Sequence, residues 1–268
     1  MRDLNIFKNA IKYFLITLPL LLMVYYLNDK LSLGLSDNEI NNFFMPLFVL
    51  LYFFLFFPDM RKSFLKHFIK TKSLDKLIAL PILLAIVDLV LSYTYMFLPV
   101  FFDKNPIMVG TNQYIAPEQL SYLGKIMLKA FIGPFNEEVI FRFLFIFFIP
   151  YKFLYNSFIK EVAYNIRPYN QFTNKQSSFI DRIGESIYYK AFYFKDNKII
   201  ILWVIFISTL FSLGHGLVVY SLPLYFFSGL IYSYLFLKYG LLSSWIAHGF
   251  GNALSPIILQ IFISILFH

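Results

Sequence analysis

The sequence predicts an all-α fold, a polytopic transmembrane helical bundle of about seven spans. Hydrophobic residues make up 59% of the 268 positions and charged residues only 14%, whereas soluble domains carry about 25% charged residues. The apolar residues also gather in long uncharged blocks, and a helix needs about 20 such residues to cross a bilayer. Both observations argue against a water-soluble fold.

The first three expected spans are 13–27, 40–57 and 77–102. The first follows three basic residues and so superficially resembles a secretory signal. No small-x-small cleavage site follows it, and we therefore expect a retained span. The loop between the second and third spans is rich in lysine.

The last four expected spans are 126–150, 199–220, 222–237 and 241–267. The 39 uncharged residues from 199 to 237 would extend about 58 Å in one helix. We therefore expect a turn at Ser221-Leu222-Pro223. The polar segment 152–198 is expected to be a cytoplasmic loop with an interfacial helix around 180–194.

The basic residues fix the expected orientation. With seven spans, 18 lysines and arginines fall in loops on one side of the membrane and three on the other. The positive-inside rule then places the N-terminus in the cytoplasm. The net charge of +8 follows from this topology, so we expect contact with anionic lipid rather than with nucleic acid. The chain has no cysteine, which excludes disulfides and thiolate metal sites.

Charged residues inside spans are costly and usually functional. They are Asp88 in the third span and Lys129, Glu137, Glu138 and Arg142 in the fourth. Glu138 and Arg142 are four residues apart and are expected to pair on one helix face, a role that could be purely structural. Glu137 is rotated by about 100° and stays outside that pair. Asp88 and Lys129 are interpreted as structural or snorkelling residues.

Two histidines also lie within apolar spans. His248 and Asn252 are one turn apart and face the same way. A carboxylate with a histidine in a poorly hydrated cavity can remove a proton from water. A histidine beside an amide supplies donors for the oxyanion that forms when water attacks a carbonyl. The structural alternative is that these polar groups only hold helices together.

Three motifs in order resemble those of one family. Residues 137–142, 211–215 and 248–252 read EEVIFR, FSLGH and HGFGN. They resemble the EExxxR, FxxxH and HxxxN motifs of the CPBP intramembrane proteases, which include type II CAAX prenyl endopeptidases and bacteriocin-processing or immunity proteins. The resemblance covers about residues 125–252.

The catalytic residues that the resemblance implies are Glu137, Glu138, Arg142, His215, His248 and Asn252. Glu137 and His215 would activate water, His248 and Asn252 would stabilise the oxyanion, and the other two would organise the helix. The family is commonly called a metalloprotease, so the alternative is a zinc ion held by Glu137, His215 and His248. The sequence leaves both open, and the cofactor is none or zinc.

The expected depths of these residues differ. Glu137 lies mid-span, His248 about eight residues from the cytoplasmic end and His215 about seventeen residues in. Straight helices of equal length would not bring them together. We therefore expect the fifth span to start deeper, or the helices to be tilted or offset, because hydrophobic length does not fix tilt.

The leading functional hypothesis is an intramembrane endopeptidase of the bacterial cell membrane. Its partners would be the lipid bilayer and a membrane-associated peptide or protein substrate. Residues 1–124 would form N-terminal spans and 125–268 the catalytic-type core with loop 152–198. The alternative is a non-enzymatic bacteriocin-immunity or scaffold protein. A proton-coupled transporter using Glu137, Glu138 and Asp88 ranks last.

Overall fold

The computed structural model describes residues 2–107, 121–150 and 197–267, and within these ranges it contains helices and no strands. The helices are α1 (Arg2–Lys30), α2 (Asp37–Phe56), α3 (Pro58–Phe68), η1 (Asp75–Ala79), α4 (Leu80–Phe97), η2 (Leu98–Phe102), α5 (Tyr122–Ile126), η3 (Met127–Ile132), α6 (Gly133–Glu137), η4 (Glu138–Phe148), α9 (Asn197–Gly214), α10 (Leu222–Tyr239) and α11 (Leu241–Phe267). The predicted all-α class is therefore confirmed. The interfacial helix expected around 180–194 lies outside the described residues.

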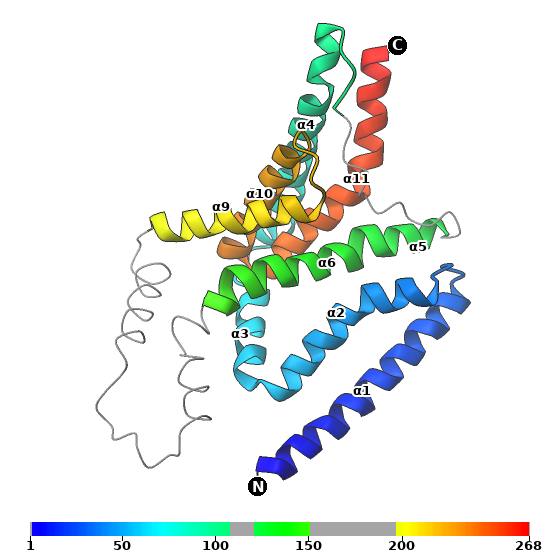
Figure 1. Cartoon of the computed structure of the whole chain (residues 1–268), viewed down its shortest axis with the longest axis vertical. Coiled ribbons are helices and arrows are strands. Elements are labelled where there is room, and N and C mark those ends of the chain that lie inside the picture. Colours follow the sequence, from blue (N-terminus) through cyan, green and yellow to red (C-terminus); the bar gives the residue numbers. More distant parts are fainter. Residues whose placement is uncertain (1, 108–120, 151–196, 268) are drawn as a thin grey trace.

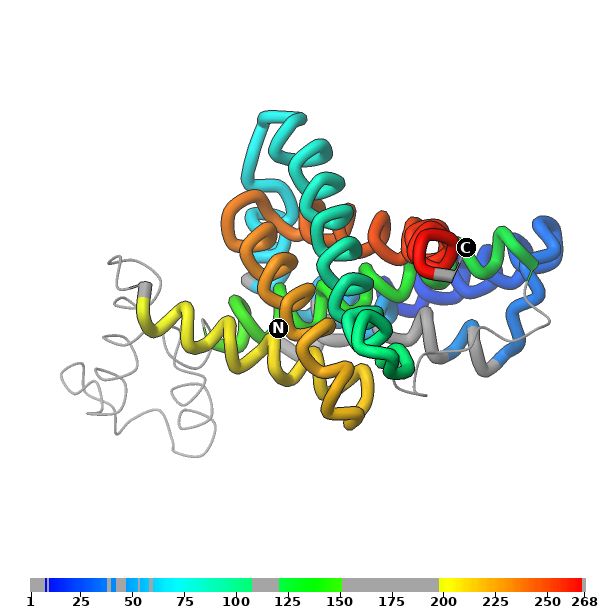
Figure 2. Tube along the Cα trace, turned by 90° about the horizontal axis from the view of Figure 1, so that it is seen from above, coloured from blue at the N-terminus to red at the C-terminus, as the bar shows by residue number. Residues whose placement is uncertain are grey.

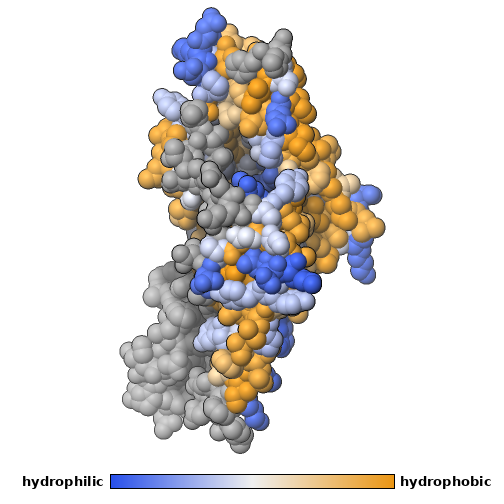
Figure 3. Space-filling view, turned by 90° about the vertical axis from the view of Figure 1, so that its right-hand side faces the viewer, coloured by the Kyte–Doolittle hydropathy of each residue, from blue (hydrophilic) through white to orange (hydrophobic). Residues whose placement is uncertain are grey.

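Helical backbone occurs in each of the seven segments predicted to be spans. Within the described residues, three helices are long and apolar enough to cross a membrane, namely Ala10–Lys30, Asp75–Phe102 and Leu241–Leu266. Large apolar side chains are exposed along all three, and Figure 3 shows apolar side chains covering much of one face of the molecule. The chain is thus a helical membrane protein, whereas the other four spans and the orientation stay predictions.

Two helical segments differ from the sequence expectation. Helix α9 ends at Gly214 rather than near residue 220, since Gly216 adopts a φ of 132°, which right-handed helix does not allow. The fourth segment is helical throughout but changes register, because η3 and η4 are π-helical. Such segments are frequent at functional sites.

The helices cross at steep angles instead of forming a parallel bundle. Figure 1 shows α9 and the stretch from α5 to η4 running across α4, α10 and α11. Helix α11 packs against α4, α10 and η3, and α10 also packs against α9. Figure 2 shows α10 beside α4. These crossings bring the end of α9, the α6–η4 junction and the first half of α11 into one place.

Candidate active site

Glu137 is the last residue of α6, and its carboxylate faces two histidine rings. Its Oε2 lies 3.5 Å from His215 Nε2 and 3.7 Å from His248 Nε2. The three residues come from α6, from the turn that follows α9, and from α11. Separations of this size exceed a direct hydrogen bond, and Glu137 Oε2 is itself buried. The structure thus brings these three predicted residues together.

His215 is held by the helix it follows. Its Nδ1 lies 2.9 Å from the carbonyl oxygen of Phe211, one of the last carbonyls of α9, which have no partner within the helix. A carbonyl only accepts, so Nδ1 donates, and the neutral ring presents the Nε2 lone pair towards Glu137. The ring also stacks on Tyr225 with centroids 4.2 Å apart. The FxxxH spacing therefore sets the tautomer of the histidine as well as its place.

His248 is oriented by the second glutamate. Its Nδ1 lies 3.0 Å from Glu138 Oε1, and its ring stacks on Tyr232 with centroids 4.7 Å apart. The other oxygen of Glu138 accepts a hydrogen bond from Ser244. Ser244 precedes His248 by one turn of α11, so a single face of α11 binds Glu138 twice.

Arg142 and Glu138 form the ion pair that their spacing predicts. Arg142 Nε lies 3.4 Å from Glu138 Oε2, and both side chains are fully buried. The guanidinium also lies over the Phe211 ring, 4.5 Å from its centroid, a favourable cation–π position. A buried carboxylate needs such a partner. Glu138 is therefore committed to Arg142, Ser244 and His248, whereas Glu137 Oε2 makes no hydrogen bond within the described residues.

Asn252 lies at the edge of the site. Its Nδ2 donates to the backbone carbonyl of Lys129 at 2.9 Å, and its side chain is exposed. This contact uses one of the two N–H groups of the amide and fixes which end of the amide is the nitrogen. The Lys129 residue itself is exposed.

One face of α10 forms a wall that the sequence did not predict. Tyr225, Ser228 and Tyr232 follow the i, i+3, i+7 spacing of a helix face. The two tyrosines lie against the two site histidines. Between them, Ser228 Oγ donates to Asp88 Oδ2 at 2.7 Å. Asp88, on α4, is buried, with 5% of its surface exposed. It therefore packs against this face of α10 and does not extend to the membrane surface.

A zinc site was the alternative that the resemblance implied. Neither Glu137, His215 and His248 as arranged nor any other three acidic, histidine or cysteine side chains in the described ranges form a group that could hold a metal ion.

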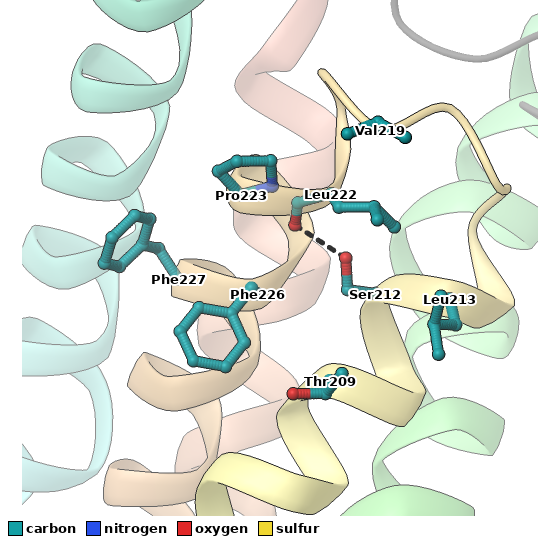
Figure 4. A pocket seen from close by; sticks show the side chains of 8 residues that line it. All are labelled: Thr209, Ser212, Leu213, Val219, Leu222, Pro223, Phe226 and Phe227. Carbon is teal, nitrogen blue, oxygen red and sulfur yellow. Dashed lines mark hydrogen bonds between the residues drawn. The ribbon is translucent and has the colours of Figure 1, made fainter.

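A cavity of about 340 Å³ lies between α9 and α10 (Figure 4). It is lined by Thr209, Ser212, Leu213, Val219, Leu222, Pro223, Phe226 and Phe227. Ser212 Oγ closes one side by donating to the Leu222 carbonyl at 2.6 Å. The lining adjoins the turn that carries His215 but includes none of the six predicted site residues. The cavity is therefore not the candidate active site.

Comparison with known proteins gives one match. A family model described as type II CAAX prenyl endopeptidase Rce1-like matches residues 119–254, just over half of the 268 residues. No curated protein and no solved structure matches the chain. The matched range contains all six predicted site residues.

Proposed function

Because the chain belongs to the Rce1-like family of type II CAAX prenyl endopeptidases, we propose that it is an intramembrane endopeptidase that hydrolyses a peptide bond in a membrane-associated peptide or protein. The observation that supports this reaction best is the convergence of Glu137 Oε2 with the Nε2 atoms of His215 and His248, at 3.5 and 3.7 Å. A general base (Glu137), a second group that can bind a proton (His215) and a hydrogen-bond donor (His248) then surround one point.

The proposed base is Glu137. It removes a proton from a water molecule whose second hydrogen is bonded to the Nε2 lone pair of His215, and the water oxygen attacks the carbonyl carbon of the scissile bond. The proton passes from Glu137 to the amide nitrogen, the C–N bond breaks, and an amine and a carboxylic acid leave. Glu137 is suited to this role because Glu138 is already paired with Arg142.

His248 and Asn252 are the proposed oxyanion donors. Since His248 Nδ1 donates to the Glu138 carboxylate, its Nε2 carries a hydrogen when the ring is protonated. Two carboxylates would then be balanced by Arg142 and protonated His248. The remaining N–H of Asn252, whose other N–H is bonded to Lys129 O, would supply the second donor.

Topology and setting remain part of the proposal. We propose seven spans with the N-terminus in the cytoplasm of a bacterial cell, residues 1–124 as N-terminal spans, and 125–268 as the catalytic-type core. The substrate would approach within the lipid bilayer, because large apolar side chains are exposed along the candidate spanning helices.

The test compares the two adjacent glutamates, with peptides released from membranes identified by mass spectrometry. Glu137→Gln is expected to lower peptide release by about 10³-fold with an unchanged unfolding temperature, as expected for loss of a general base. Glu138→Gln leaves Arg142 buried without a carboxylate, and we expect it to destabilise the fold by about 3 kcal/mol.

The outcomes separate the remaining alternatives. Identical peptide profiles for wild type and Glu137→Gln, with equal expression and a substrate present, would refute proteolysis and favour the immunity or scaffold function. Zinc bound stoichiometrically to the wild type and lost in Glu137→Gln would replace the metal-free mechanism with one in which Glu137, His215 and His248 are ligands.

A further inference from the structure

The fourth helical segment contains a break in its own hydrogen-bond ladder. The N–H of Gly133 bonds to the Leu128 carbonyl, five residues back. The next residue, Pro134, has no N–H. It therefore cannot donate to Ala130 O four residues back or to Lys129 O five residues back. The sequence thus leaves backbone carbonyls about two turns before Glu137 without a donor from Pro134.

Helix α11 contacts three consecutive carbonyls at this break. Trp245 Nε1 donates to Phe131 O at 2.9 Å, and Asn252 Nδ2 donates to Lys129 O at 2.9 Å. Between them, a Cβ on Gly249 would lie 2.1 Å from Ala130 O, so the two backbones touch there. The residues 245, 249 and 252 lie at i, i+4 and i+7 on one helix face.

We propose that this face sets the rotation and depth of α11, and that Trp245 is a positioning residue for His248. The neighbouring face of α11 carries Ser244 and His248, which both bind Glu138. A helix fixed on two adjacent faces cannot rotate. His248 is therefore held beside Glu137 by backbone carbonyls of η3, one of which, Lys129 O, has no donor from Pro134. The effect of this contact on kcat rests on the proposed endopeptidase function, whereas its effect on the position of α11 does not.

Trp245→Phe isolates the contribution of the indole N–H. The Trp245 ring packs edge-on against Phe135, with centroids 5.0 Å apart, and a phenylalanine keeps most of that packing. It leaves Phe131 O without its donor from α11. Without this hydrogen bond, one of the contacts that hold α11 against η3 is lost.

The chain supplies a matched control. It has two tryptophans, and the other, Trp203 on α9, donates Nε1 to the carbonyl of Phe145 in η4 at 3.0 Å. Trp203→Phe removes the same kind of contact between a helix and a π-helical segment, but it leaves α11 untouched. A general loss of stability would affect both variants alike.

The experiment uses the full chain in lipid nanodiscs and two readouts. Leu123 and Ile257 are exposed, and the chain has no native cysteine, so spin labels on Leu123→Cys and Ile257→Cys report the distance between α5 and α11. Trp245→Phe is expected to broaden that distance distribution and to lower kcat about tenfold with KM within about twofold, because small misplacements of catalytic groups are costly. Trp203→Phe should change neither.

Pro134→Ala tests the origin of the free carbonyls. It restores an N–H that can compete with Asn252 of α11 for Lys129 O, so we expect the same broadening and the same loss of kcat. The double variant with Trp245→Phe should be no more than about twofold worse than either single variant, since both changes weaken the same packing of α11 on η3.

Each outcome decides the proposal. An unchanged distance distribution in both Trp245→Phe and Pro134→Ala would overturn it, and so would an equal loss of kcat in Trp203→Phe and Trp245→Phe. Broadening in a protein whose wild type releases no peptide would support the positioning contact while refuting the endopeptidase function.

Discussion

Helices α1 and α4 are both long, apolar and outside the matched residues 119–254, yet the molecule uses them differently. None of the spanning window in α1 is buried, against 17% of the window that contains α4. Helix α1 packs mainly on α2. Helix α4 buries Asp88, which accepts a hydrogen bond from Ser228 beside the site.

Apolarity therefore predicts membrane insertion but not proximity to the candidate active site. In lipid, apolar surface gains little from packing on other helices, so polar and small residues decide which helices associate. Helix α4 has both kinds, because Asp88 meets α10 and Ala85 lies opposite Gly251 of α11. The physical unit around the site therefore extends beyond the matched residues to include α4.

The largest expected effect comes from the closest helix contact in this unit. Gly249→Ala would place a Cβ 2.1 Å from the backbone oxygen of Ala130, which cannot move without shifting a helix. We expect loss of the folded protein or a fall of more than about 3 kcal/mol in unfolding free energy, the range of severe packing defects. The measurement is thermal unfolding in detergent micelles.

Gly251→Ala is the matched control for that variant. Its Cβ would meet Tyr232 Oη at 3.5 Å and Ala85 Cβ at 3.9 Å, which are ordinary contacts. We expect an unchanged or slightly higher unfolding temperature, since alanine favours a helix over glycine. Equal destabilisation by both variants would mean that the close contact with η3 at Gly249 is not what makes Gly249→Ala costly.

A smaller effect compares α1 and α4 directly by deleting one hydroxyl from each. Tyr93 on α4 donates to the Ser255 carbonyl of α11 at 2.9 Å, whereas Tyr13 on α1 donates to the Phe48 carbonyl of α2 at 3.3 Å. We expect Tyr93→Phe to cost about 1 kcal/mol of unfolding free energy and Tyr13→Phe less than about 0.5 kcal/mol. Equal costs would show that α1 is as tightly packed as α4.

Much of the fold was predictable because long apolar blocks have few structural solutions in a membrane. The helical class and the family resemblance, first inferred from three motifs, are confirmed. Helix α3 and the π-helical segments were not predicted. Helix α3 begins at Pro58, and η3 ends two residues before Pro134. Hydropathy does not record such local features.

Within the site, contacts inside one helix were easier to predict than contacts between helices. Glu138 and Arg142 pair as their spacing indicates. Ser244, Tyr225 and Tyr232 were missed, because their partners lie on other helices and become neighbours only through the crossing angles. Pro134 was the one local feature that could have indicated the contact with α11, since a proline inside a helix frees a carbonyl.

Helix α3 lies between α1 and α4 in the sequence. The pH dependence of stability can show whether α3 is packed tightly, like α4, or loosely, like α1. His67 lies over Phe147 of η4, with centroids 3.7 Å apart, and burial together with the charge of Lys70 lowers the pKa of His67 to about 4. The unfolded chain therefore binds a proton that the fold excludes between about pH 6.5 and 4, so stability falls as pH falls through that window. His67→Phe should remove about 1 kcal/mol of this loss between pH 8 and pH 5, after allowance for solvent screening. Parallel unfolding curves for wild type and variant at both pH values would instead place α3 with the loosely packed α1.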